Sequence, residues 1–258
     1  MTEEDHRLLY ELEEGYWWFI GMRAITAALL DPHCAPAGSL DLLDAGCGTG
    51  IMLSWLTRYS RVKPVVGIDF SRHGLRFCRQ RGHSLLALAS VTGLPFATNR
   101  FDLITCFDVL CQLPTTDASD IEALHELHRI LKPQGLLYLR VPAYKWLRSS
   151  HDTALHTYHR YTLREIVTKL QRVGFTVERA TYANTLPFLL ALVRRLLKKA
   201  GIGRAGSDVT PFPAWLRWLN GVLLSLLLRE ARYLSRHGTR FSFGLSAICL
   251  ARKPGAPG

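Results

Sequence analysis

The sequence lacks several features that would assign a function at once. No apolar run reaches the roughly 18 residues that a membrane-spanning helix needs. The six cysteines form no CxxC pair, so they are interpreted as reduced core thiols rather than zinc ligands. No glycine-rich stretch ends in the Gly-Lys-Ser/Thr of a nucleotide-binding P-loop. Because the first five residues are acidic rather than basic and apolar, no secretion signal is expected, and the predicted location is cytoplasmic.

Acidic residues are scarce in the last part of the chain. The 258 residues carry a net charge of +11, but residues 186–258 contain 12 Lys and Arg against 2 Asp and Glu. The preceding residues are therefore almost neutral, which argues against a nucleic-acid surface over the whole molecule. A hydrophobic content of 48% is enough for one large domain, or for a domain with an appendage.

Residues 40–50 are the most informative stretch. The apolar run Leu40–Ala45 predicts a buried strand, three glycines follow two residues apart, and Ile51–Tyr59 has helical spacing. Strand, glycine turn and helix form the first unit of a doubly wound α/β sheet. Glycine is required where backbone takes a positive φ or must touch a ligand. The third glycine comes one residue too early for the G-x-G-x-x-G dinucleotide fingerprint.

A second acid-tipped strand is expected at Pro64–Asp69. Asp69 lies 19 residues after Gly50, and in this architecture an acid at that place accepts hydrogen bonds from the ribose hydroxyls of a nucleoside. An acid at a strand end can also cap the following helix, although Ser71 could do so here. Further strands are predicted at Leu85–Ala89 and in the segment beginning at Phe101, and an amphipathic helix is expected at Asp120–Leu131.

The turn Asp-x-Gly-x-Gly-x-Gly closely resembles the first motif of class I S-adenosylmethionine-dependent methyltransferases. The stretch 101–143 is similar to F-D-L…L-x-E-L-x-R-x-L-K-P-x-G…V-P of their small-molecule branch, which includes quinone-biosynthesis enzymes. The resemblance implies S-adenosyl-L-methionine as cofactor, with the glycines near its amino-acid part, Asp69 on the ribose and Ser90 and Val91 beside the adenine. The candidate cofactor-binding residues are Asp44, Gly46, Cys47, Gly48, Gly50, Asp69, Phe70, Ser90, Val91, Phe107 and Asp108.

Two positions depart from that resemblance. Ser90 stands where relatives often have an acid, and a neutral hydroxyl is a weaker partner for the adenine amine than a carboxylate. Residues 110–114 read Leu-Cys-Gln-Leu-Pro where relatives often have Leu-Glu-His, so no general base can be transferred to that place.

The expected fold is α/β, a Rossmann-like doubly wound, seven-stranded mixed sheet with a helical insertion before the last strand. The resemblance implies a last strand antiparallel between the fifth and sixth, and the expected segment is 241–251. Four divisions of the chain are expected. They are a helical and aromatic N-terminal flap (1–39), the methyltransferase core (40–182), a basic apolar helical insertion (183–240), and the final strand with the tail (241–258).

Four adjacent aromatics at Tyr16–Phe19 suit neither a clean helix face nor an edge strand, and a helix is expected from about Met22. They are interpreted either as a plug on the core or as a flap over a flat ligand, with Arg23 available for a carboxylate.

Three histidines, His151, His156 and His159, lie within nine residues. Their spacing does not keep them on one helix face, so a metal site is not expected. They are candidate catalytic or hydrogen-bonding groups on the substrate side. The alternative is a loop that leads into a capped helix at Thr162–Val173.

The basic, leucine- and tryptophan-rich insertion has three open interpretations. It suits a helix in a membrane interface or contact with a lipid-like substrate, but also a plain lid or dimer face. Nucleic acid is disfavoured because its aromatics cluster with leucines. The predicted function is direct methyl transfer to a small or amphiphilic molecule, in a protein that is cytoplasmic or peripherally bound to a membrane. A catalytically inactive partner protein and a nucleic-acid methyltransferase are the alternatives.

Overall fold

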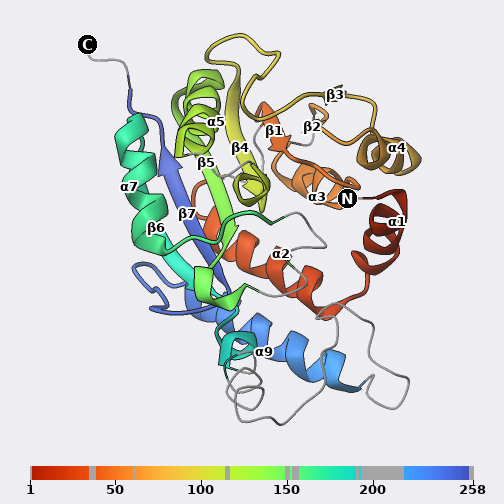
Figure 1. Ribbon diagram of the computed structural model, residues 1–258, viewed down its shortest axis with the longest axis vertical. Coiled ribbons are helices and arrows are strands. Elements are labelled where there is room, and N and C mark those ends of the chain that lie inside the picture. The colour runs from red at the N-terminus through yellow and green to blue at the C-terminus, as the bar shows by residue number, and fades with distance from the viewer. Residues whose placement is uncertain are drawn as a thin grey trace.

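The computed structural model describes residues 2–34, 39–60, 62–113, 117–148, 152, 157–189, 192 and 218–255. Its centre is one seven-stranded sheet in the order β3-β2-β1-β4-β5-β7-β6 (Figure 1). The strands are β1 (Leu42–Ala45), β2 (Val66–Asp69), β3 (Leu86–Leu88), β4 (Phe101–Phe107), β5 (Leu131–Pro142), β6 (Thr176–Ala183) and β7 (Ser246–Arg252).

The sheet has the topology that the sequence predicts. Strands β1 to β5 pair in parallel, while β7 runs antiparallel between β5 and β6. Because the order reverses between β1 and β4, the carboxyl ends of these two strands flank the crevice where doubly wound sheets bind ligands.

Helices cover both faces of the sheet. On one face lie α5 (Asp117–Ile130) and α7 (Leu163–Val173), whose buried side chains join one apolar core. On the other face lie α2 (Trp17–Leu30), α3 (Ile51–Leu56), α4 (Arg72–Gln80) and α9 (Trp218–Leu234), which share a second core. Figure 1 shows α9 running alongside α2, and α1 (Glu3–Leu12) beside α4 at the edge of the molecule. Short 3-10 turns follow at Thr57–Tyr59, Leu110–Gln112 and Lys145–Leu147.

Local sequence explains several helix ends. Thr162 and Glu165 form the expected capping box of α7, and Gly174 ends the helix at a φ of 103°. Ser71 caps α4 through a hydrogen bond from the N–H of Gly74.

Three expected boundaries were wrong. The helix placed from Met22 begins at Trp17, so the four aromatics occupy its N-cap and first turn. Its apolar residues recur around most of its circumference because α2 is packed between the sheet and α9, which hides the expected one-sided pattern. Helix α5 starts at Asp117 rather than Asp120, and β7 starts only at Ser246, after the segment 241–245.

Candidate functional site

The glycine turn leaves β1 at the carboxyl edge of the sheet. Gly46, Gly48 and Gly50 all have positive φ, at 86°, 54° and 89°. A Cβ on Gly46 would lie 2.1 Å from a methyl of Val109, whereas a Cβ on Gly48 would meet no heavy atom within 4 Å. The turn is therefore packed at Gly46 against Val109, which follows β4, whereas the space where Gly48 would carry a side chain is unoccupied. Gly50 is the N-cap of α3, so the free N–H groups of that helix face the turn.

Asp69 ends β2 beside this turn. Its carboxylate accepts the backbone N–H of Gly48 at 2.8 Å and that of Ser71 at 2.7 Å. Only 8% of the residue is exposed, and burial is the main cause that raises the pKa of its carboxyl. The next residue, Phe70, is 63% exposed although it is a large apolar side chain. A fixed carboxylate next to an exposed ring suits a sugar with an attached flat base.

Asp44 lies one strand away, fully buried in β1. It accepts a hydrogen bond from the hydroxyl of Thr105 at 2.7 Å. The pKa of Asp44 is raised to about 7, mainly by burial; the neighbouring Asp69 also raises it, whereas the hydrogen bond from Thr105 lowers it. Because burial disfavours the charged form of both acids, a cationic ligand at this edge would relieve an unfavourable arrangement.

Phe107 and Asp108 form the exit of β4. Asp108 has a φ of 56° and accepts hydrogen bonds from Nε and Nη2 of Arg140 at 2.9 and 2.6 Å. The guanidinium of Arg140 also lies 4.9 Å from the ring centre of Phe107 and 5.1 Å from that of Trp18. Asp108 is therefore held by an ion pair and is not a free base.

The remaining cofactor candidates flank this group. The Cys47 and Cys78 sulfurs are 3.7 Å apart, and both residues are buried free thiols. Val91 is buried, while Ser90 is exposed and its hydroxyl bonds that of Thr92 at 2.8 Å. Ser90 thus lies at the rim of the site after β3, where it accepts the N–H of Thr92.

The histidine stretch is only partly described, since His151 and His156 lie outside the described residues. Nε2 of His159 is 2.8 Å from Glu165, the residue that completes the capping box of α7. His159 also lines a cavity of about 150 Å³ with Lys145, Arg148, Thr157, Tyr158 and Arg160. Within the part of the chain that the structure describes, no three His, Cys, Asp or Glu residues are arranged to hold a metal ion.

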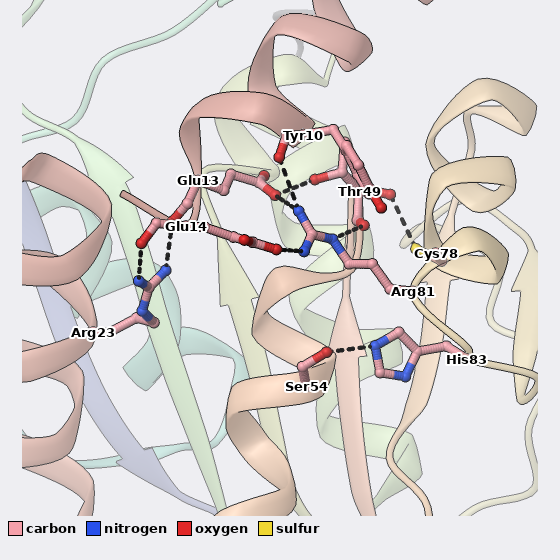
Figure 2. A network of polar contacts seen from close by, with 10 residues as sticks. Tyr10, Glu13, Glu14, Arg23, Thr49, Ser54, Cys78, Arg81 and His83 are labelled. Atoms are coloured by element: carbon pink, nitrogen blue, oxygen red, sulfur yellow. Dashed lines mark hydrogen bonds and ion pairs between the residues drawn. The ribbon is translucent and has the colours of Figure 1, made fainter. Parts of the chain in front are cut away.

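Three further residues belong to this edge, and the sequence patterns did not identify them. Glu13, just after α1, contacts the hydroxyl of Thr49 in the glycine turn. Arg81, at the end of α4, donates to the Thr49 carbonyl at 3.1 Å (Figure 2). Arg140 is the third, and its only sequence signal is a lone Arg within the apolar strand 136–141. Arg23, expected to be available for a ligand carboxylate, instead donates to the carbonyl of Glu13 at 2.8 Å.

The residues at this edge fit an aminonucleoside sulfonium. The open turn at Gly48 offers backbone close approach, Asp69 offers a fixed acceptor for hydroxyls, and the buried acids complement positive charge.

Comparison with known proteins finds methyltransferases. Residues 43–139 match a family model described as a methyltransferase domain. The chain is 33% identical to a fatty-acid O-methyltransferase of Mycolicibacterium smegmatis over 44% of this chain and 43% of that protein. It is 32% identical to malonyl-[acyl-carrier protein] O-methyltransferase 1 of Coxiella burnetii over 57% and 48%, respectively. A demethylmenaquinone methyltransferase of Chlamydia muridarum is 28% identical over 51% and 55%. The chain thus spans about half the length of the curated relatives that it matches.

Solved structures share the whole fold at low identity. An S-adenosylmethionine-dependent methyltransferase from Mesorhizobium loti has a TM-score of 0.56 and 18% identity, over 91% of this chain and 98% of that one. The [4+2]-cyclase SpnF has a TM-score of 0.59 and 20% identity, over 94% and 87%. The second likeness illustrates that the fold alone does not fix an activity. Residues 43–139 thus match a methyltransferase domain, and the chain as a whole has the fold of solved S-adenosylmethionine-dependent methyltransferases.

Proposed function

We propose that this protein transfers a methyl group from S-adenosylmethionine to a small amphiphilic molecule. The observation that carries the proposal is the Asp69 carboxylate, fixed by the N–H groups of Gly48 and Ser71 beside an open turn. The cofactor supplies its own electrophilic methyl group, so the protein has to hold donor and acceptor in line and exclude water. Asp69 would hold the ribose, Asp44 would face the positive charge, and Phe70 and Val91 would flank the adenine.

An aromatic cluster supports an apolar acceptor. It consists of five side chains from the carboxyl ends of β5 and β6 and the segment before β7, namely Tyr144, Trp146, Tyr182, Phe188 and Phe243. The Tyr144 and Tyr182 rings stack with centres 5.1 Å apart. Trp146 is 50% exposed and Phe243 is 40% exposed, so part of the cluster is accessible at the surface. Tyr144 has a φ of 60°, a strained conformation for a bulky residue that is typical of functional sites.

The cationic cavity next to this cluster supports a polar or acidic head group on the acceptor. Residues 145–147 join the two, since Lys145 lines the cavity and Trp146 belongs to the aromatic cluster. The relatives' names, a fatty-acid and a demethylmenaquinone methyltransferase, describe acceptors of this apolar kind in those proteins. His159, on the cavity wall, is proposed as the group that orients or deprotonates the acceptor.

A peripheral membrane contact is also proposed, through the outer face of α9. Trp218 is 63% exposed and Val222, one helical turn later, is 45% exposed. None of the described helices is long and apolar enough to cross a bilayer. A W218S/V222S variant should float less with anionic liposomes than the wild type, because interfacial binding depends on buried apolar area. Equal flotation of both proteins would remove the membrane contact.

The decisive experiment is calorimetric titration with S-adenosylmethionine and S-adenosylhomocysteine, followed by turnover. Asp69→Asn should weaken both affinities about tenfold or more, because a charge-assisted hydrogen bond contributes roughly 1.5–3 kcal/mol. Asp102→Asn, at the opposite end of the sheet, is the matched control and should bind normally. Turnover is then measured as release of S-adenosylhomocysteine with a long-chain fatty acid or a polyprenylated naphthoquinol. Folded wild type that binds neither nucleoside would refute the proposal, and binding without any turnover would favour a catalytically inactive partner protein.

A further inference from the structure

Helix α1 packs beside α4, next to the edge of the sheet that holds the glycine turn and Asp69, here called the cofactor edge. Few of its side chains are buried. Of its ten residues only His6 is buried. Its contacts with α4 include the rings of Tyr10 and Phe77, whose centres are 5.1 Å apart, and surface ion pairs of Glu3 with His73 and Arg76. Exposed pairs of this kind contribute little to stability. The attachment of α1 to the domain therefore depends mainly on its C-terminal end, where Tyr10 packs against Phe77 and Glu13 contacts Thr49.

That end is fastened by a buried polar network, shown in Figure 2. The carboxyl of Glu13 meets the hydroxyl of Thr49 and, at 3.4 Å, the guanidinium of Arg81. Arg81 in turn donates to the carbonyls of Tyr10 and Thr49 at 3.0 and 3.1 Å, and its guanidinium lies 4.1 Å from the ring centre of Tyr10. The side chains of Glu13 and Arg81 are only 9% and 7% exposed.

The network joins α1 directly to the turn that should hold the cofactor. Thr49 lies between Gly48, whose N–H bonds Asp69, and Gly50, which begins α3. Moving Glu13 away would leave the Thr49 hydroxyl and the Arg81 guanidinium without this partner. Such a contact has a discrete made and broken form, which is what a gate requires.

We propose that α1 is a cover over the cofactor edge, and that the contact of Glu13 with Thr49 and Arg81 is the fastening that opens when the nucleoside enters or leaves. The inference rests on the proposed function for the identity of the ligand, but the fastening itself can be measured without ligand.

The same contact makes opening depend on pH. Burial raises the pKa of Glu13 to about 7 while α1 is closed, although Thr49 and Arg81 partly counteract it. In the open form the solvated carboxyl returns towards its ordinary pKa of about 4.3. The other charged groups that face it are Arg23 on α2, the adjacent Glu14, and Asp44 on β1. Because the closed form binds this proton more tightly, closure is favoured at low pH and weakens as pH rises through 7.

The test compares Glu13→Ala with Glu14→Ala. Glu14 bonds the same Arg81 at 2.7 Å, but its side chain is 70% exposed, so it is a matched control. At pH 6, Glu13→Ala should release S-adenosylhomocysteine about tenfold faster than wild type, and Glu14→Ala should change the rate less than about twofold. Glu13→Gln can still accept from Thr49 and should make the release rate independent of pH between 6 and 8. Wild-type release rates in Glu13→Ala would overturn the proposal.

Hydrogen exchange of residues 3–12 in the free protein provides the second readout. These amides should exchange about tenfold faster in Glu13→Ala than in Glu14→Ala at the same pH, while those of β4 stay protected in both. If wild type bound no nucleoside, the proposed function would fail and this comparison would still decide the fastening. Equal exchange in the two variants would show that Glu13 does not hold α1.

Discussion

Substituting Gly48 and Gly46 separately should distinguish a ligand-binding turn from a turn that is merely tight. Both glycines have a positive φ, so an alanine at either place costs roughly 1 kcal/mol of folding free energy in the left-handed region. The two differ in what surrounds the missing side chain. The Cβ of Gly46→Ala would overlap a methyl of Val109 at 2.1 Å, whereas that of Gly48→Ala would lie in open space.

The magnitudes follow from these surroundings. Overpacking of a buried site adds roughly 1–3 kcal/mol, so Gly46→Ala should lose about 2–4 kcal/mol in total. Replacing Val109 by alanine in the same chain should recover part of that loss, because the overlapping methyl is removed. Gly48→Ala should lose only about 1 kcal/mol and remain fully folded. If the open space at Gly48 is where the nucleoside approaches the backbone, the added methyl should abolish measurable binding.

The assay pairs urea unfolding with calorimetric titration of S-adenosylhomocysteine on each variant. The expected pattern is a stable Gly48→Ala that does not bind, and an unstable Gly46→Ala whose stability improves with Val109→Ala. A Gly48→Ala protein that binds as tightly as wild type would refute the assignment of the turn to the cofactor. A fully stable Gly46→Ala would refute the packing argument.

Three further substitutions give separate outcomes. Asp44→Asn keeps an acceptor for Thr105 but removes a carboxyl whose pKa is raised to about 7, mainly by burial. Wild type without ligand should lose folding stability as pH rises from 5 to 8, because this buried carboxyl ionises. The variant should lose less, by on the order of 1 kcal/mol in thermal unfolding. Burial opposes ionisation of Asp41, but hydrogen bonds from Lys132 and two other cations hold the pKa of this carboxyl well below its ordinary value. The ionised Asp41 carboxylate therefore stabilises the fold above about pH 4, and this stabilisation is lost on acidification. Asp41→Asn should make the unfolding free energy less dependent on pH below about 4, without changing the affinity for the cofactor. His159→Asn should lower kcat roughly a hundredfold and leave the dissociation constant of S-adenosylhomocysteine unchanged if His159 acts on the acceptor; an unchanged kcat would assign it to capping α7.

The parts of the fold that could be predicted are those encoded by neighbouring residues. The strand, glycine turn and helix at 40–59 follow from hydrophobic period and from positions that only glycine tolerates. The acid ending β2 was found by its spacing, and the antiparallel β7 by the resemblance to a known family. Each of these signals lies within one short segment or at one fixed spacing.

The contacts that were missed join residues far apart in the sequence. Glu13 and Thr49 are separated by 36 positions, and nothing near Glu13 in the sequence distinguishes it from the acids of the preceding α1. Arg140 contacts Asp108 across 32 positions and Trp18 on a different layer. Such pairs depend on how the layers dock, which hydrophobic periodicity does not encode. The start of α2 was misplaced for the same reason, since its aromatic first turn is stabilised by tertiary packing rather than by helix propensity.

The environments of the carboxyl groups provide an independent argument for the site. At the amino end of β1, Asp41 is surrounded by cations, and the pKa of its carboxyl is lowered. At the carboxyl end of the sheet, Asp44, Asp69 and Glu13 are each buried, and the pKa of every one of these carboxyls is raised. Arg81 offsets part of the cost at Glu13, but an arrangement selected for stability alone would also surround Asp44 and Asp69 with cations, as Asp41 is surrounded. Burying these acids costs folding free energy. A cation that binds at this edge offsets that cost, because it stabilises the charged form of the carboxyls, so the arrangement favours binding of a cation there. The strand that supplies Asp44 thus has a stabilising end and a binding end, and the direction of the pKa shift identifies each.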